Sequence, residues 1–521
     1  MSVERVPTRR AVIRERNVVA TKPKKTSIPT PLRPRLTCPH CGKAFPPGDI
    51  LWVAEHPSLV GDDLLGESEQ NRFLPTRFDV EGRAIDVKGV TCHELACPNC
   101  HLLIPPALVE LEPVFISTLG APSSGKSYFL AAMIHQAQDA VMRHFHSNLA
   151  DVDPVANEIV NDYLNKLFRN SQPGELVNLE KTQQTGRQYN SVNLDQRDIW
   201  LAKPFVYSLQ PMKLQDERLR RQLCRAVCLY DNAGEHFMPG KSASQMATQH
   251  MAHSKVLLFL FDPLQHANFR QACFGRAEDP QLGDHGKNNP QNQVLEEAAR
   301  RVRNLTGLGQ HEKFSRPLIV VVTKYDVWHT LLTEEMVDMN SLLCRTADRG
   351  TALDMKRLQK LSQRTRELLF QLAPDIVAAA EGFSDEVIYL PNSALGCSPE
   401  KLPGNKGLGV RPCNIRPRLA ELPLLYALHR AVPTLIPGIM RTGDNGSAAF
   451  IPVNEPAAHP ALKPGAMLAK AMAEKRAAPA NPAPAPVPMR REVPLTEAPV
   501  DVTTPAEVRP KVEGYLKEAG P

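Results

Sequence analysis

The stretch LGAPSSGKSYF at residues 119–129 places the tightest constraint on how this chain can fold. It fits the pattern GxxxxGK[ST], with Gly120, Gly125, Lys126 and Ser127 at the fixed positions. The loop works between a strand and a helix, because its backbone N–H groups then meet a phosphate at the positive helix N-terminus. The apolar run PVFISTL precedes it, and the amphipathic pattern SYFLAAMIHQAQ follows it. We therefore predict a P-loop here rather than a Gly/Ser-rich turn.

Strand-length apolar runs alternate with helical patterns from about 113 to about 435. This alternation predicts an α/β domain with a mainly parallel sheet and helices on both faces. The expected strands are PVFISTL, KPFVYSLQ, RAVCLYD, KVLLFLFD, RPLIVVVTKYD and EVIYLPNSA. The expected helices cover residues 127–145, 292–305, 364–380 and 419–432.

The two ends of the chain differ from this middle part. A chain of 521 residues is longer than a single compact core usually accommodates, so several regions are expected. Residues 1–36 are basic and lack periodicity, which favours a disordered arm over a contact with nucleic acid or an anionic surface. Its cations are Arg9, Arg10, Arg14, Arg16, Lys22, Lys24 and Lys25. Residues 436–521 are rich in Ala and Pro and are predicted to be a disordered tail.

Composition and apolar runs bear on the cellular location of the protein and on its partners. The N-terminus lacks the apolar segment of a signal peptide, and runs such as VLLFLF are far too short to cross a bilayer. A cytoplasmic location is the resulting expectation. The net charge of +6 is modest for this length, so it demands no nucleic-acid partner. The eleven cysteines are an odd number and do not suggest a disulfide framework.

Four of these cysteines form two Cys-x-x-Cys pairs, Cys38 with Cys41 and Cys97 with Cys100. Each short turn brings two thiolates to one side, and two such turns complete a tetrahedral zinc site. We predict a zinc-ribbon domain over residues 37–110, with an inserted hairpin or loop between the pairs. Cys92 or His93 could replace one ligand. Taken alone, each CxxC pair could instead be a redox-active pair. A closed Cys₄ site is structural, because it leaves no open coordination position.

The phosphate loop predicts its own ligand contacts. Backbone N–H groups of residues 121–127, Ser124 among them, would surround the β-phosphate. Lys126 would bridge the β- and γ-phosphates, and the Ser127 hydroxyl would bind Mg²⁺. In RAVCLYDNAGE, Asp231 ends a strand and could hold Mg²⁺ through water, while the Gly234 N–H could contact the γ-phosphate.

Two later stretches bear on the base. RPLIVVVTKYD ends a strand in Thr323, Lys324 and Asp326, which fits [NT]KxD. A carboxylate there can accept from guanine N1–H and the 2-amino group, which adenine does not offer, while the Lys324 stem packs along the base. In YLPNSALG, residues 393–395 are Ser-Ala-Leu, and a backbone N–H at Ala394 could donate to guanine O6. The stretches together favour GTP over ATP.

The ordered set GAPSSGKS, DNAGE, TKYD and SAL resembles the translation-factor-related (TRAFAC) class of P-loop GTPases over about 113–435. The preceding zinc ribbon, the insertions and the Pro/Ala tail make the chain similar to bacterial double-GTPase families of predicted conflict or signalling systems. The resemblance implies a Ras-like G domain at 113–435 that works with protein partners. It implies phosphate, Mg²⁺ and base contacts at Gly120, Gly125, Lys126, Ser127, Asp231, Gly234, Lys324, Asp326 and Ala394.

The sequence departs from that family pattern at two positions. Thr323 replaces the commoner Asn, which should remove a hydrogen bond that steadies the phosphate loop. Glu235 stands where many members carry a Gln or His that orients the attacking water, and His236 is a candidate substitute. The switch threonine is expected at Thr182 or Thr185, and Arg187 could act as a charge-stabilising arginine, although a solvated arginine is favoured.

Three hypotheses follow from these patterns. The first is a GTP-hydrolysing switch whose loops at about 175–195 and 232–250 become ordered with Mg²⁺-GTP. The second is a GTP-gated scaffold that scarcely hydrolyses the nucleotide, which Glu235 keeps open. The third is an ATPase of another P-loop group, which would require Asp326 to miss the base.

Overall fold

The computed structural model describes residues 33–179, 187–194, 196–238, 245–283, 290–347, 350–405, 407–441 and 448–449. These residues all belong to the compact unit Met1–Ala458. The basic arm up to residue 32, the two switch-threonine candidates Thr182 and Thr185, and most of the Pro/Ala-rich tail lie outside the described residues.

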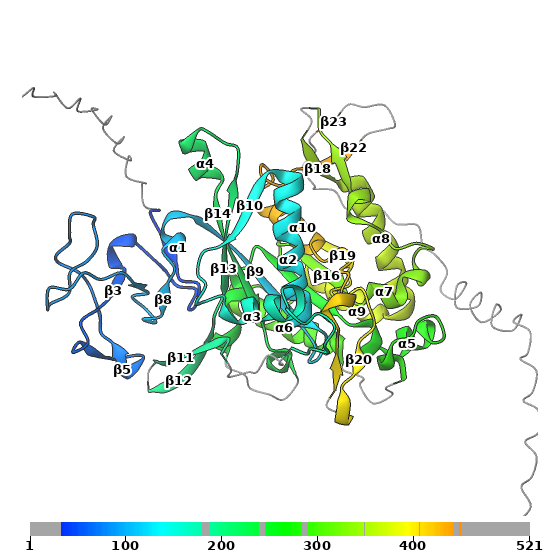
Figure 1. The fold of residues 1–521 in the computed structure, drawn as a ribbon, viewed down its shortest axis with the longest axis horizontal. Coiled ribbons are helices and arrows are strands. Elements are labelled where there is room, and N and C mark those ends of the chain that lie inside the picture. Colours follow the sequence, from blue (N-terminus) through cyan, green and yellow to red (C-terminus); the bar gives the residue numbers. More distant parts are fainter. Residues whose placement is uncertain are drawn as a thin grey trace, which may run out of the picture. The chain divides into compact units, whose positions relative to one another are not determined.

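A seven-stranded sheet forms the centre of this unit, in the order β10-β13-β14-β9-β15-β16-β19 (Figure 1). The strands β14, β9, β15, β16 and β19 are parallel, and β10 and β13 add antiparallel pairs at one edge. Each apolar run predicted as a strand supplies one of these strands. Their bounds are β9 Glu112–Gly120, β10 Ser147–Asp151, β13 Phe205–Pro211, β14 Arg225–Asp231, β15 Val256–Phe261, β16 Leu318–Val322 and β19 Val387–Pro391.

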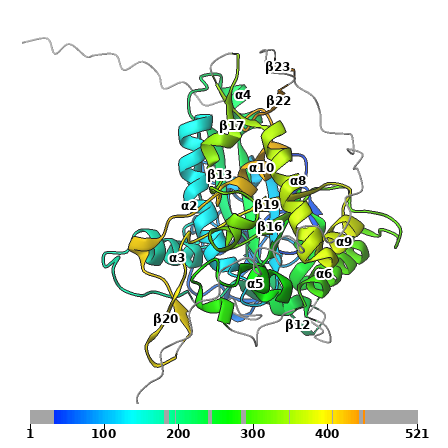
Figure 2. The same ribbon diagram turned by 90° about the vertical axis from the view of Figure 1, so that its right-hand side faces the viewer.

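Helices cover both faces of the sheet, so the fold is mixed α/β. Figure 2 shows α2 and α3 on one side and α6, α8 and α9 on the other. All residues of β15 and β16 are buried, as expected for parallel strands covered on both faces. The larger helices are α2 Lys126–Phe145, α3 Glu158–Phe168, α6 Gln291–Thr306, α8 Met355–Leu372, α9 Pro374–Phe383 and α10 Leu422–Ala431. The shorter ones are α1 Ala107–Glu110, α4 Glu217–Leu223, α5 Ala267–Cys273 and α7 Tyr325–Trp328.

The helix predicted over 364–380 is in fact two helices. α8 ends at Leu372, Ala373 takes φ −143° and ψ 63°, and α9 begins at Pro374. Proline has no N–H to donate to the preceding turn, and its ring disfavours a helical conformation at the residue before it. The single helix was therefore a wrong prediction, although both halves are helical.

An N-terminal module of short strands precedes the large sheet. The hairpin β1–β2 carries the first cysteine pair at its turn, and the hairpin β7–β8 carries the second. Between the two hairpins lie β3 and β6, which extend the β7–β8 hairpin to a sheet of order β6-β3-β7-β8, and the separate hairpin β4–β5. The bounds are β1 Leu36–Thr37, β2 Ala44–Phe45, β3 Leu51–Val53, β4 Val60–Asp62, β5 Gly66–Gln70, β6 Arg72–Phe73, β7 Leu95–Ala96 and β8 Leu103–Ile104.

Two further hairpins and a four-stranded sheet make up the other strands of the described residues. Part of the region expected as a switch loop is a hairpin of β11 and β12, and a second small hairpin, β20–β21, follows the last strand of the large sheet. Strands β17, β18, β22 and β23 form a small separate sheet. The bounds are β11 Tyr189–Leu194, β12 Arg197–Ala202, β17 Leu343–Arg345, β18 Thr351–Asp354, β20 Glu400–Lys401, β21 Leu408–Gly409, β22 Gly438–Arg441 and β23 Ala448–Ala449.

The cysteine module shares a hydrophobic core with the large sheet. The four cysteines of the two pairs belong to the same buried cluster as Val206 of β13 and Cys228 and Tyr230 of β14. The module is thus packed onto the sheet rather than tethered to it. Within the described part of the chain, none of the helices has the length and apolar character needed to cross a bilayer.

Candidate functional site

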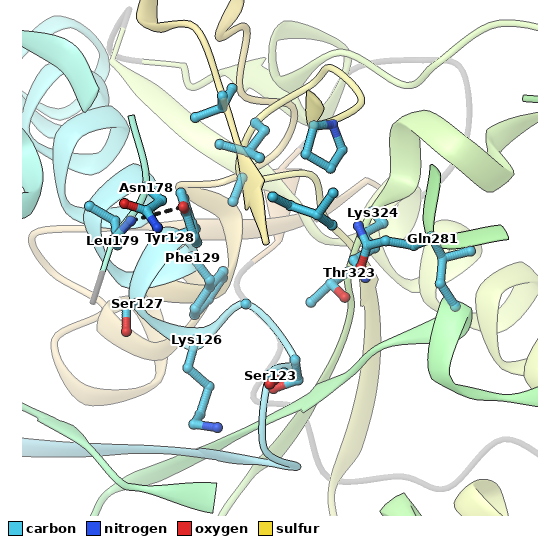
Figure 3. A pocket seen from close by; sticks show the side chains of 18 of the residues that line it. Ser123, Lys126, Ser127, Tyr128, Phe129, Asn178, Leu179, Gln281, Thr323 and Lys324 are labelled. Atoms are coloured by element: carbon cyan, nitrogen blue, oxygen red, sulfur yellow. Dashed lines mark hydrogen bonds between the residues drawn. The ribbon is translucent and has the colours of Figure 1, made fainter. Parts of the chain in front are cut away.

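The predicted motif segments converge on one cavity of about 590 Å³ at the carboxyl ends of the parallel strands. In open α/β sheets this edge is the usual place for a ligand. The lining comes from the loops that follow β9, β14, β15, β16 and β19. It includes Ser123–Phe129, Gly234, Glu235, Leu264, Gln265, Asp279, Gln281, Thr323, Lys324, Asp326, Ser393, Ala394, Leu395 and Cys397. Figure 3 shows Lys126 and Ser127 at one end and Thr323, Lys324 and Gln281 at the other.

The loop after β9 has the backbone shape of an anion-binding turn. Ser123 and Gly125 both adopt left-handed conformations, with φ of 61° and 85°, and α2 begins at Lys126. Alternation between left-handed and ordinary residues turns successive N–H groups to the same side, and the dipole of a 20-residue helix adds to the attraction for an anion. The loop is therefore shaped to hold a phosphate.

Lys126 lies inside this loop. Its Nζ donates to the carbonyl oxygens of Gly120 and Ala121 at 3.1 and 2.9 Å, and its side chain is buried. Burial lowers the pKa of Lys126, and the nearby charges of Asp231 and Glu235 oppose that shift. A buried ammonium group favours an anionic ligand within its reach, because the ligand offsets the cost of burying the charge.

The segment after β14 lies directly against the phosphate loop. A methyl group on Gly234 would come within 2.6 Å of the Gly120 carbonyl oxygen and of the Pro122 nitrogen, so only glycine allows this approach. Glu235, the next residue, lines the cavity. Asp231, predicted as a Mg²⁺ ligand, is buried at the end of β14, and the Gln188 amide donates to its Oδ2 at 3.5 Å.

His236 has a different environment from Glu235. It is buried, its ring lies 5.2 Å from that of Tyr189, and it is not among the residues that line the cavity. Arg301 of α6, itself buried, donates to the His236 carbonyl at 2.6 Å. The structure therefore places Glu235 at the cavity and His236 in the packing behind it.

The opposite end of the cavity is built around Lys324. This residue has a left-handed conformation, with φ of 57°, at the start of α7. Its Nζ forms an ion pair with Asp262 at 2.6 Å and donates to Gln281 Oε1 at 2.8 Å. Asp262 is fully buried and follows β15, the strand beside β16. These contacts fix the Lys324 stem along the cavity wall.

Asp326 and Ser393 come together from two neighbouring strands. The Ser393 hydroxyl donates to Asp326 Oδ1, and the Gly396 N–H donates to Ser393 Oγ at 2.8 Å. Burial raises the pKa of the Asp326 carboxyl, and the bond from Ser393 partly offsets this effect. Ala394 and Leu395 line the same end. The arrangement presents a carboxylate edge to a ligand that carries N–H donors.

Thr323 bonds to the neighbouring strand rather than to the phosphate loop. Its Oγ1 and backbone N–H both donate to the Phe261 carbonyl, at 3.1 and 2.9 Å. The phosphate loop is instead tied by Gln265, whose amide donates to the Pro122 carbonyl at 3.3 Å.

Sequence reasoning missed Asp262, Gln265, Asp279 and Gln281 at this site. Asp262 carried a usable signal, because it ends the apolar run VLLFLF as Asp231 ends RAVCLY. Gln265, Asp279 and Gln281 carried no such signal, since they lie in an insertion whose path depends on the tertiary fold.

The region before the predicted switch threonines borders the cavity. Asn178 and Leu179 line it, and Leu179 N–H donates to the Tyr128 hydroxyl at 3.0 Å (Figure 3). Val177 pairs with Val410 beyond β21. Beyond the undescribed residues 180–186, Arg187 is exposed and forms an ion pair of 2.7 Å with Glu158 of α3.

The two cysteine pairs meet in one cluster. The Sγ atoms of Cys38, Cys41, Cys97 and Cys100 all lie within 4.8 Å of one another, and all four residues are buried. Sγ separations are 3.7 Å for Cys38–Cys100 and for Cys41–Cys97. A tetrahedron with zinc–sulfur bonds of about 2.3 Å has sulfur–sulfur distances of about 3.8 Å. The spacing therefore fits a zinc ion bound by four thiolates.

The environment of the cluster also suits thiolates. The backbone N–H groups of His40 and Cys41 point at Cys38 Sγ, and that of Asn99 points at Cys97 Sγ, at 3.3–3.4 Å. Burial raises the pKa of Cys38, so a bound cation is needed for all four thiols to ionise together. Cys92 is buried away from the cluster, and its thiol donates a hydrogen bond to the Val90 carbonyl. His93 is exposed. Neither belongs to the four-cysteine cluster.

Fold and site together define a mixed α/β protein with a mainly parallel seven-stranded sheet, a phosphate-loop motif and a four-cysteine cluster. No protein-family model matches the chain, and no curated protein matches it either. One similar solved structure is the crystal structure of sup35 complexed with GDP. The identity is 14%, the TM-score is 0.20, and the match covers 55% of this chain but only 38% of that one. A similarity of this size carries no functional argument, so the function is argued from the site.

Proposed function

We propose that this protein is a Mg²⁺-dependent GTPase of the TRAFAC type with a Ras-like G domain and a structural zinc ribbon. The observation that carries the proposal is the single cavity in which the phosphate loop, Gly234–Glu235, Thr323–Asp326 and Ser393–Leu395 meet. These segments are far apart in sequence, and each follows a different parallel strand. A chance match to one motif would not bring the other three to the same cavity.

Base recognition is assigned to the end of the cavity around Asp326. An ionised carboxylate accepts from guanine N1–H and from the 2-amino group, and Ser393 holds that carboxylate in place. Adenine lacks this pair of donors, so a site built to accept them discriminates strongly against ATP. The fixed stem of Lys324 supplies an apolar surface for the base.

Phosphate binding is assigned to the other end. The N–H groups of the loop and the Lys126 ammonium would hold the β- and γ-phosphates. Lys126 would exchange its bonds to the Gly120 and Ala121 carbonyls for bonds to phosphate oxygen. Ser127 and Asp231 offer the oxygen ligands that Mg²⁺ prefers, and the ion would neutralise phosphate charge.

Hydrolysis is assigned to water as the nucleophile. The water oxygen forms a bond to the γ-phosphorus, the bond to the β–γ bridging oxygen breaks, and GDP and phosphate leave. Glu235 is the acidic side chain beside Gly234 at this end of the cavity, so it is assigned to orient the water and accept its proton. The loops would be ordered in the GTP state and released in the GDP state. The protein would thereby act as a switch for protein partners in a bacterial signalling or conflict system.

A GTP-gated scaffold is the second candidate, and the position of His236 favours it. With His236 packed behind Tyr189, Glu235 remains the residue beside Gly234 that can act on water, and its charge repels the γ-phosphate. In this case binding would order the loops, while turnover would be very slow.

Equilibrium binding and phosphate release test these assignments. Labelled GTP should bind at least about 100-fold more tightly than ATP, and Asp326→Asn should move the preference toward xanthine nucleotides. Equal binding of GTP and ATP would contradict the guanine assignment. Multiple-turnover phosphate release should exceed that of Lys126→Ala. Tight GTP binding with release no faster than in that variant would favour the scaffold.

A further inference from the structure

The insertion after β15 places a second carboxylate in the base end of the cavity. Asp279 precedes the 3₁₀ turn Pro280–Gly283 and lines the cavity together with Asp326. Only 7% of its surface is exposed. One of its oxygens, Oδ1, accepts the Gln281 N–H at 2.7 Å. Within the described part of the chain, the other oxygen accepts no hydrogen bond.

The turn that carries Asp279 is attached to the base-binding machinery. Gln281 Oε1 accepts from Lys324 Nζ at 2.8 Å, and the same Nζ pairs with Asp262. Asp279 is therefore held near Lys324 and Asp326 rather than near Lys126. The electrostatic interactions of Asp279 agree with this position, because the charges that act on its carboxyl are those of Lys324, Asp326 and Asp262.

This end of the cavity is rich in hydrogen-bond acceptors. Three carboxylates lie here, at Asp262, Asp279 and Asp326, and the Lys324 ammonium is already paired with the first of them. Burial raises the pKa of Asp279, and the like charges of Asp326 and Asp262 add to this shift. A ligand edge rich in N–H groups would relieve the cost of placing the buried Asp279 and the half-buried Asp326 carboxylates against the same cavity.

Guanine offers such an edge, with one hydrogen on N1 and two on the 2-amino group. Asp326 has two oxygens, which can accept the N1 hydrogen and one amino hydrogen. The second amino hydrogen then has no acceptor in Asp326. A second carboxylate that lines the cavity would accept it, and Asp279 is a buried carboxylate of this lining.

We propose that Asp279 accepts the second hydrogen of the guanine 2-amino group and is a further specificity-determining residue. The inference rests on the proposed GTP binding and extends it. It makes the site selective for the 2-amino group itself, in addition to the N1–H. A nucleotide without that group would leave the second oxygen of Asp279 without a donor and would remove one donor from Asp326, which is costly in a site with little access to water.

Inosine triphosphate tests the idea, because it keeps N1–H and the 6-oxo group of GTP but lacks the 2-amino group. The wild-type protein should bind GTP at least about 100-fold more tightly than ITP, since two hydrogen bonds to carboxylates are lost. The variant Asp279→Asn keeps Oδ1 for the Gln281 N–H and puts an NH₂ donor where the second oxygen was. Its GTP affinity should fall about ten- to 100-fold, while its ITP affinity should change by less than about threefold.

Two control variants separate this effect from general electrostatics. Glu278→Gln removes an exposed charge next to Asp279 and should change neither affinity. Asp326→Asn should weaken GTP and ITP together, because both nucleotides lose the acceptor for N1–H. If Asp279→Asn weakens GTP and ITP by the same factor, or leaves both unchanged, the role of Asp279 is wrong while GTP binding stands. If the wild-type protein shows no preference for GTP over ATP, the proposed function itself fails.

Should Asp279→Asn fold poorly, the ratio of GTP to ITP affinity in the wild-type protein still tests the second acceptor. A GTP-to-ITP ratio near tenfold would correspond to one lost hydrogen bond and would contradict the second acceptor. Thermal melting of each variant checks that the comparison is made on folded protein.

Discussion

The hydroxyl of Tyr230 donates a hydrogen bond of 2.6 Å to the carbonyl of Pro39, which ties β14 to the first cysteine pair. The Tyr230 ring is buried and stacks on His250 at 4.1 Å between ring centres. The Gln249 amide donates to the His40 carbonyl at 3.2 Å. The cysteine cluster thus packs against the strand that ends in Asp231 and against the segment that follows Gly234.

Tyr230→Phe tests the link between the cluster and the strand. The variant keeps the ring and its stacking on His250 but removes the donor to the Pro39 carbonyl. The free energy of unfolding should fall by about 1–2 kcal/mol, because a buried carbonyl loses its partner. Urea denaturation measures the change, and the metal content should stay constant. An unchanged midpoint would mean that the bond contributes nothing to stability.

The cysteine cluster should hold about one zinc per chain, and metal analysis of the purified protein checks this. Combined Cys38→Ser and Cys97→Ser substitutions should remove the metal and lower the free energy of unfolding by on the order of 4 kcal/mol. Because the cluster packs on β14, GTP affinity should weaken in the same variant. Cys413→Ser is the matched control, since that cysteine is exposed and outside the cluster. Full stability without zinc would rule out a structural site.

Gly234→Ala should abolish hydrolysis while the protein stays folded. A methyl group there would meet the phosphate-loop backbone at 2.6 Å, so the segment carrying Glu235 must move away. Phosphate release should fall at least about 100-fold. Gly382→Ala is the control, because a methyl group on that helical glycine has nothing within 4 Å. It should add roughly 0.5–1 kcal/mol of stability without changing turnover. Equal turnover in the two variants would contradict the role of Gly234.

Stability should fall in acid because of His250. Burial lowers its pKa from 6.5 to about 3 in the folded protein, so over this range the unfolded chain binds a proton that the native protein does not. The free energy of unfolding therefore drops as pH falls, with His250 contributing up to about 1.4 kcal/mol per pH unit. His250→Phe, which preserves a ring against Tyr230, should flatten this slope. The surface substitution His311→Gln should leave it unchanged, and equal slopes in all three proteins would exclude the effect.

Base selectivity should also depend on pH. The Asp326 carboxyl must be ionised to accept two N–H groups, and burial raises its pKa. The ratio of GTP to ATP affinity should therefore fall as pH drops, and it should do so above the pH at which an ordinary carboxyl protonates. The ratio removes the titration of the phosphates, which both nucleotides share. Ser393→Ala removes a bond that stabilises the carboxylate, so the decline should begin at higher pH. A ratio that stays constant down to the pH at which ordinary carboxyls protonate would contradict the assignment.

The strands and the phosphate loop could be predicted because local patterns determine them. Fully apolar runs such as VLLFLF are suited to buried parallel strands, and glycine at position 125 permits the left-handed turn before α2. The break at Pro374 is also encoded locally, because proline disfavours a helical conformation at the residue before it. The β11–β12 hairpin lies in a stretch whose polar residues resemble a loop, and its buried Tyr189, Val192 and Leu201 find their core only on the large sheet.

The sequence by itself determined the residue types of the site: a phosphate loop, two cysteine pairs and strand-ending residues such as Asp231 and Asp326. Only the tertiary structure decided which of them meet. The order of β9, β15 and β16 brings Asp262 to Lys324 and the Asp279 turn to the base end of the cavity. Tertiary packing also brings the first cysteine pair into contact with Tyr230 of β14. Such contacts join residues far apart in the chain, and no local pattern encodes them, because strand order and packing set the distances between them.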